Sequence, residues 1–248
     1  MDMGKEIGEA LNFVQVFSIT IFGVKIPINE TVVISWAVMI ILIAASLILT
    51  RKLKTVPKGR QALLEAAVDF LNNFTGSRFG KRAKTYGPYI GTLFLFLLLT
   101  NLLPVLSPVG VSFAGLHFIP PFSIKPPCRD VNFTAALALV TILIVLFGGL
   151  KARGIKGWAK NLMHPTPVML PFNLLEYIIR PLSLCFRLFG NVLGAFIIMR
   201  LIEAVMPLAL PPVFSLYFDF LDGLIQTLVF VFLSTLFIAE AVEVESSH

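Results

Sequence analysis

The sequence predicts an all-α membrane protein with five transmembrane helices. Hydrophobic residues make up 57% of the 248 residues, charged residues make up only 14%, and the mean hydropathy is +0.88. Soluble domains have about 45–50% apolar and about 25% charged residues. The apolar residues also gather into runs that are long enough to cross a bilayer, which takes roughly 20 residues of helix. These two observations exclude a disordered chain and an ordinary soluble globule.

The first 30 residues are predicted to form an outer N-terminal segment rather than a span. Its apolar stretch, residues 13–24, is short and contains Gln15 and Thr20. We therefore interpret this stretch as an interfacial segment that ends in a turn at Gly23. The chain starts with acidic residues and no small-residue cleavage site follows the stretch, so neither a signal peptide nor a transit peptide is expected.

The apolar runs fall into two groups. Three runs fit simple spans: 31–50, 88–107 and 133–150. Two are longer than a span requires: 171–206 and 212–243. As helices these two would be about 54 and about 48 Å long at 1.5 Å per residue, whereas the hydrocarbon core is about 30 Å thick. We therefore expect two long helices that are steeply inclined in the membrane.

Basic residues set the predicted orientation of the chain. The segments interpreted as loops at 51–87 and 151–170 contain nine and four Lys and Arg residues. Residues 1–30 and 108–132 contain two each. The positive-inside rule then places the N-terminus outside and the C-terminus in the cytoplasm. This topology also accounts for the net charge of +6, so no nucleic-acid partner is expected.

Charged side chains interrupt only the last two apolar runs. They are Glu176, Arg180, Arg187, Arg200, Glu203, Asp219 and Asp222. Charges at membrane depth are costly, face the protein interior or water, and mark ion or proton pathways. At 100° per residue, Glu176, Arg180 and Arg187 lie within about 40° of one another, and Asn191 continues the stripe. One face of this helix is therefore polar at membrane depth.

These charges differ in how readily a structural role explains them. Glu176 and Arg180 fit an i, i+4 ion pair, which is either structural or part of a pathway. Arg187 has no acidic residue three or four positions away, which favours a functional role. Arg200 and Glu203 lie near the end of their run, where the side chains can reach the interface.

The last run adds carboxylates and an amide. Asp219 and Gln226 are seven residues apart and share a helical face, and Asp222 lies between them. These carboxylates either accept protons at an aqueous inlet or are hydrated at the interface. The acidic residues from Glu240 onward are expected to form a solvated end. The sequence contains no phosphate-binding loop and no metal-ligand cluster, so neither a cofactor, a metal nor a catalytic site is expected.

Residues 180–191, RPLSLCFRLFGN, resemble the signature of subunit a of F-type ATP synthases, which carries a membrane arginine. The stretch IFGVKIPINETVV before the first span and LDGLIQTLVFVFLSTLFIAEAVE at the end resemble the same family. The resemblance implies ion translocation, with protons as the expected ion, through two half-channels that reach a rotating c ring. Arg187 would separate the half-channels, Asn191 and Gln226 would surround it, and Asn101 would line the outer half-channel.

The sequence departs from the family pattern at one position. Many relatives have a glutamate, or in some a histidine, five residues after the asparagine, where this chain has Phe196. Because phenylalanine cannot relay a proton, we expect Asp219 to take over the inlet role, with Glu203 as a second candidate.

The resemblance implies a non-catalytic subunit that contacts the c ring, the b subunits of the peripheral stalk and lipid. A bacterial plasma membrane is the expected location, and a thylakoid membrane is the alternative. The two other readings are a stand-alone transporter or channel and a passive membrane anchor. The missing internal repeat disfavours the transporter, and the charges in both long runs disfavour the anchor.

Overall fold

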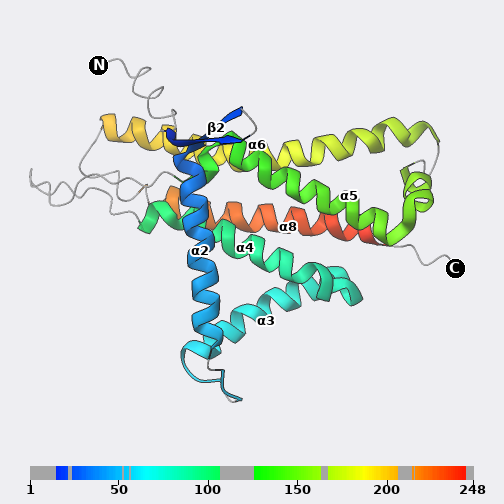
Figure 1. The fold of residues 1–248 in the computed structure, drawn as a ribbon, viewed down its shortest axis with the longest axis horizontal. Coiled ribbons are helices and arrows are strands. Elements are labelled where there is room, and N and C mark those ends of the chain that lie inside the picture. Colours follow the sequence, from blue (N-terminus) through cyan, green and yellow to red (C-terminus); the bar gives the residue numbers. More distant parts are fainter. Residues whose placement is uncertain are drawn as a thin grey trace, which may run out of the picture.

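A computed structural model describes most of the chain (Figure 1). The described residues are 15–21, 24–51, 53–55, 57–106, 126–162, 167–205, 214 and 216–243. For some of these, among them Arg200, Glu203 and Asp219, only the backbone is described. Five helices among the described residues are long and apolar enough to cross a membrane. The predicted class, an all-α membrane protein with five spans, is therefore confirmed.

The N-terminal segment forms a β-hairpin, which the sequence did not lead us to expect. Strands β1 (Gln15–Ile21) and β2 (Val24–Asn29) pair antiparallel, and Ile21 lies opposite Val24. Apolar and polar residues alternate along both stretches, which is the pattern of a strand rather than of a helix. The turn expected at Gly23 lies outside the described residues.

Helix α2 (Glu30–Thr50) follows the hairpin and coincides closely with the first predicted span. Glu30 places a carboxylate in the first turn, where it interacts favourably with the positive end of the helix dipole. In Figure 1, α2 runs across the direction of the other long helices. It packs against α4 and exposes most of its apolar side chains.

Residues 51–87 are not simply a loop, so that prediction was wrong. Helix α3 (Arg60–Phe79) and helix α4 (Ala83–Leu106) form a helical hairpin, joined by the 3₁₀ turn η1 (Gly80–Arg82). Gly80 has a φ of +53°, which glycine adopts without the steric cost of a Cβ atom. Charged and amide residues interrupt the apolar residues of α3, so hydropathy alone did not identify this helix.

Helix α5 (Val131–Leu162) extends past the predicted end of the third span at residue 150. It bends at Gly154, whose φ is +70°. The 3₁₀ turn η2 (Pro127–Arg129) precedes α5, and the turn η3 (Pro167–Met169) leads into α6 (Leu170–Val205). The predicted loop at 151–170 is therefore mostly helical.

The last described segment contains a π-helix. Residues Leu216–Asp222 (η4) form wide π-turns, and the regular helix α8 (Gly223–Val242) follows. The predicted single helix over 212–243 is thus two helical segments of different pitch. π-Turns inside a helix are rare and frequently occur at functional sites.

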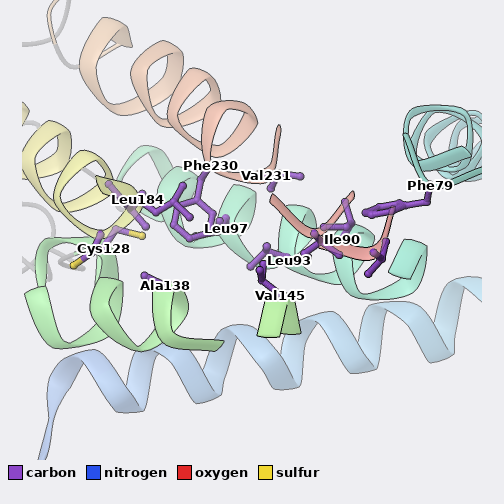
Figure 2. Packing of buried hydrophobic residues seen from close by; sticks show 14 residues of the cluster. Phe79, Ile90, Leu93, Leu97, Cys128, Ala138, Val145, Leu184, Phe230 and Val231 are labelled. Atoms are coloured by element: carbon purple, nitrogen blue, oxygen red, sulfur yellow. The ribbon is translucent and has the colours of Figure 1, made fainter. Parts of the chain in front are cut away.

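Helix α8 lies in the middle of the bundle, packed against α3, α4, α5 and α6. The apolar core is formed mainly where α4, α5, α6 and α8 meet (Figure 2). Phe230 of α8 and Leu97 of α4 are fully buried there, and Leu184 of α6 is nearly so. This packing fixes the positions of the polar residues on α6 and α8 relative to one another.

Gly148 on α5 leaves room for side chains of α4 and α8 in this core. A Cβ atom at this position would lie 2.9 Å from the Tyr86 hydroxyl and 3.1 Å from Val242 Cγ1. Gly148→Val should therefore destabilise the protein by about 1–3 kcal/mol, as overpacking does. Gly76→Val is the matched control, because a Cβ atom on Gly76 would meet nothing within 4 Å. The thermal midpoint of the purified protein measures both variants, and equal midpoints would contradict the prediction.

Candidate functional site

Helix α6 presents an open apolar face. It packs against α5 on one side and against α8 on another. Large apolar side chains along the rest of its surface are exposed: Phe172, Leu174, Leu175, Ile178, Ile179, Leu182, Phe186, Ile198 and Leu201. An apolar face of this length requires lipid or another protein to cover it.

Arg187 lies on α6 and is exposed. It has no hydrogen-bond or ion-pair partner within the part of the chain that the structure describes. Its side chain borders a cavity of about 330 Å³ that is lined mainly by apolar side chains of α3 and α8, including Phe74 and Phe232. A guanidinium carries its charge at every physiological pH. The site therefore contains a fixed positive charge beside an apolar surface.

Asn191 lies one turn after Arg187 on α6 and contacts α8. Its Nδ2 donates a hydrogen bond of 2.7 Å to Gln226 Oε1. Gln226 is only 2% exposed, so this bond crosses the interior between the two long helices. The pairing brings together two residues that were predicted to surround Arg187.

Asn101 of α4 contacts the next residue of α8. Its Nδ2 donates to Thr227 Oγ1 at 3.0 Å and to the Gly223 carbonyl at 3.5 Å. Thr227 in turn donates to the same carbonyl at 2.8 Å. A Cβ atom on Gly223 would lie 3.2 Å from the Asn101 carbonyl oxygen, so glycine allows α4 and α8 to approach here. Thr227 is a site residue that sequence reasoning missed, although it adjoins Gln226.

Two buried polar atoms in this cluster lack a partner among the described residues. They are Asn101 Oδ1, an acceptor, and Gln226 Nε2, a donor. A buried polar atom without a partner costs about 1–3 kcal/mol, and an internal water commonly satisfies such groups. The cluster of Asn101, Thr227, Gln226 and Asn191 therefore has the chemistry to hold water between α4, α8 and α6.

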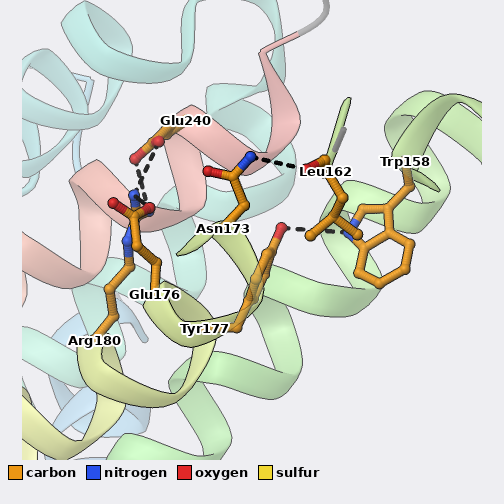
Figure 3. A network of polar contacts seen from close by, with 7 residues as sticks. All are labelled: Trp158, Leu162, Asn173, Glu176, Tyr177, Arg180 and Glu240. Atoms are coloured by element: carbon orange, nitrogen blue, oxygen red, sulfur yellow. Dashed lines mark hydrogen bonds and ion pairs between the residues drawn. The ribbon is translucent and has the colours of Figure 1, made fainter. Parts of the chain in front are cut away.

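A second polar network lies near the N-terminal end of α6 (Figure 3). Arg180 Nη2 contacts Glu176 Oε2 at 2.7 Å, which is the predicted i, i+4 pair. Arg180 also binds Glu240 of α8, with Nη1 2.7 Å from Oε2 and Nη2 3.0 Å from Oε1. Glu240 is 61% exposed, as expected of a solvated end, and it also ties α8 to α6. Glu240 lies on another helix, 60 residues after Arg180 in the chain. No local spacing in the sequence therefore predicted this ion pair.

Helix α5 joins this network through hydrogen bonds. Arg153 Nη2 donates to the Glu240 and Glu243 carbonyls, and Trp158 Nε1 donates to the Tyr177 hydroxyl at 3.3 Å. Asn173 Nδ2 donates to the Leu162 carbonyl at 2.9 Å. The N-terminal part of α6 is thus attached to both α5 and α8.

Removing the guanidinium of this network should weaken the contact between α6 and α8. Arg180→Ala leaves the carboxylates of Glu176 and Glu240 close together with no cation between them. Because both carboxylates are more than half exposed, the expected loss of stability is at most about 1 kcal/mol. Thermal unfolding of the purified protein measures this loss. Arg180→Ala combined with Glu240→Gln should recover part of the loss, and no recovery would contradict a direct ion pair.

The remaining acidic candidates lie on or beside the π-helix or near the end of α6. Asp222 is half-buried at the junction of η4 and α8. The backbone of Asp219 lies in η4 and that of Glu203 in α6, but their side chains are not described. Because a π-turn contains more residues than an α-turn, the regular helical phase that placed Asp219 on the face of Gln226 does not extend through η4.

Comparison with known proteins gives a consistent result. Residues 32–239 match the family model described as "ATP synthase A chain". The chain is 36% identical over 217 residues to ATP synthase subunit a of Moorella thermoacetica. The aligned region covers 88% of this chain and 92% of that protein. It is 35% identical over 213 residues to the sodium ion specific ATP synthase subunit a of Propionigenium modestum. The aligned region covers 86% of this chain and 73% of that protein.

Proposed function

The chain belongs to the ATP synthase subunit a family, and on this basis we propose that it provides two half-channels through which ions reach a rotating c ring. The observation that carries the proposal is Arg187, an exposed cation on the open apolar face of α6. In this proposal the chain is a non-catalytic subunit of the complex. The coupling ion in this proposal is the proton. Sodium is the alternative, because one relative is sodium ion specific.

Arg187 acts on the carboxylates of the ring. When a deprotonated ring carboxylate passes, the guanidinium stabilises it in surroundings of low dielectric. Two unit charges 4 Å apart attract by about 4 kcal/mol at an effective dielectric constant of 20. The same charge repels a cation that enters from either half-channel. Direct passage is blocked, and the ion crosses only when the ring turns.

Polar residues on either side of Arg187 form the half-channels. Asn101 and Gln226, each with an unpartnered polar atom among the described residues, support a water-filled outer half-channel. Asp219, Asp222 and Glu203 supply its carboxylates in this proposal. Glu176 and Arg180 belong to the inner side.

The open face of α6 suits the ring as its partner, because it is long, apolar and carries Arg187. The b subunits of the peripheral stalk and lipid cover other faces of the bundle. The proposed location is a bacterial plasma membrane, with the N-terminus outside and the C-terminus in the cytoplasm; a thylakoid membrane is the second possibility.

Cross-linking tests the contact with the ring. A cysteine at Phe186 on α6 is combined with a cysteine on the outer helix of the c subunit, and Ile48→Cys on α2 is the matched control. Both native cysteines are buried, and burial raises the pKa of the Cys128 thiol to about 12, so it stays protonated and unreactive. Oxidation should join only the Phe186→Cys variant to the ring. A c-subunit adduct from Ile48→Cys but none from Phe186→Cys would contradict the proposal.

A further inference from the structure

A buried arginine lies against the C-terminal half of α6. Arg129, at the end of η2, is only 3% exposed. The η2 turn packs against α2, α4, α5 and α6. Arg129 was expected among the charges of an outer loop, whereas the structure places its guanidinium 4.3 Å from the centre of the Phe196 ring on α6. This contact joins the start of α5 to α6.

The backbone around Arg129 holds the side chain in place. The Arg129 amide donates to the Pro126 carbonyl at 3.0 Å and closes the 3₁₀ turn. The next residue, Asp130, is buried, and its Oδ1 accepts a 2.9 Å hydrogen bond from the Asn132 amide at the start of α5. Arg129 is therefore attached to a fixed turn rather than to a free loop.

The chemistry of the contact is specific to the two side chains. A guanidinium remains charged when buried and stacks on aromatic rings, and cation–π attraction grows when the pair is desolvated. Leucine at position 196 would fill much of the same space without attracting a cation. Tyrosine or tryptophan would keep the attraction.

Phe196 is one of several attachments along α6. Arg180 binds Glu240 near the N-terminal end, Asn191 binds Gln226 further along, and Phe196 meets Arg129 five residues, or about 7.5 Å, after Asn191. Arg187 lies between the first two attachments. Outside its packing against α5 and α8, the surface of α6 is open. These side-chain contacts therefore help to align its polar residues.

We propose that Arg129 and Phe196 form a positioning pair that fixes the C-terminal half of α6 and thereby aligns Asn191 with Gln226 in the ion path. The inference rests on the proposed function, because it assigns the pair a role in ion entry on that side of Arg187. Neither residue contacts the ion in this scheme. Both act through the position of α6.

The test uses the complete ATP synthase in membrane vesicles. ATP synthesis is measured while the ion concentration is varied on the side of the α6 C-terminus, first by pH at fixed sodium and then by sodium at fixed pH. Phe196→Leu and Arg129→Gln should each raise the half-saturating concentration of the coupling ion about tenfold, equivalent to about 1.4 kcal/mol. Phe196→Tyr should stay within about twofold of wild type, since it retains the ring.

Two further variants complete the design. Phe147→Leu removes an exposed ring on α5, away from the open face of α6, and should leave the half-saturating concentration unchanged. The double variant Arg129→Gln/Phe196→Leu should raise the half-saturating concentration by less than the product of the two single effects, because the two side chains contact each other. Where Phe196→Leu does not assemble, Phe196→Met fills the space without a ring and takes its place.

Each outcome supports or contradicts the proposed role of Arg129 and Phe196. A merely structural role lowers the amount of assembled enzyme and its maximal rate while the half-saturating concentration stays unchanged, and that result overturns the inference. Equal values for Phe196→Leu and Phe196→Tyr overturn it as well. Failure of the proposed function gives a different result from failure of this inference. If the proposed function is wrong, vesicles with the Arg187→Ala complex pump ions normally.

Discussion

Replacing Arg187 by alanine should lower ion-driven ATP synthesis at least about 100-fold. Among the fully described side chains on the open face of α6, Arg187 is the only exposed cation. It lies one turn before Asn191, which binds Gln226 of α8. Two close charges attract by about 4 kcal/mol at a moderate dielectric constant. Losing this attraction is sufficient to explain a decrease in rate of about 100-fold. Arg187→Lys keeps the charge but not the planar fork of donors. It should retain a measurable rate that is still at least about tenfold below wild type.

The control for this variant is Arg51→Ala, which removes an exposed arginine at the end of α2. Its rate should match wild type when equal amounts of complex are present in the membrane. Immunoblotting of the other subunits establishes that amount. An Arg187→Ala complex that assembles and synthesises ATP at the wild-type rate would show that the arginine has no part in translocation.

Asp219→Asn should lower proton-driven ATP synthesis about tenfold or more, since an amide in place of an inlet carboxylate cannot take up and release protons. Asp219 is the proposed inlet group because the family resemblance implies a glutamate at position 196, where this chain has a phenylalanine that cannot relay a proton. Asp219→Glu restores a carboxylate and should recover much of the rate. Asp69→Asn on α3 is the control for a lost negative charge. Near-normal synthesis by Asp219→Asn would leave Asp222 or Glu203 as the inlet group.

The sequence was sufficient for features that depend on hydropathy and on local spacing. The five spans follow from the lengths of the apolar runs. The pair of Glu176 and Arg180 follows from the i, i+4 spacing on one helix. These features require no knowledge of which helices are neighbours.

The features that the sequence did not predict depend on contacts between distant segments. Glu240 binds Arg180 and Arg129 stacks on Phe196 because of how α8 and η2 pack against α6. Helix α3 was missed for another reason, since its charged and amide residues lower its hydropathy below that of a span. The π-helix at Leu216–Asp222 has no periodicity that separates it from an ordinary helix.

ATP-driven ion pumping by vesicles that carry the Arg187→Ala complex, compared with wild type, tests the central claim most directly. The same membranes are then stripped of the soluble catalytic sector, and the passive ion leak is measured. We predict that pumping is lost in a fully assembled complex and that the leak increases, because no fixed charge then separates the two half-channels. Normal pumping with an unchanged leak would contradict the account and leave Arg187 with a structural role only.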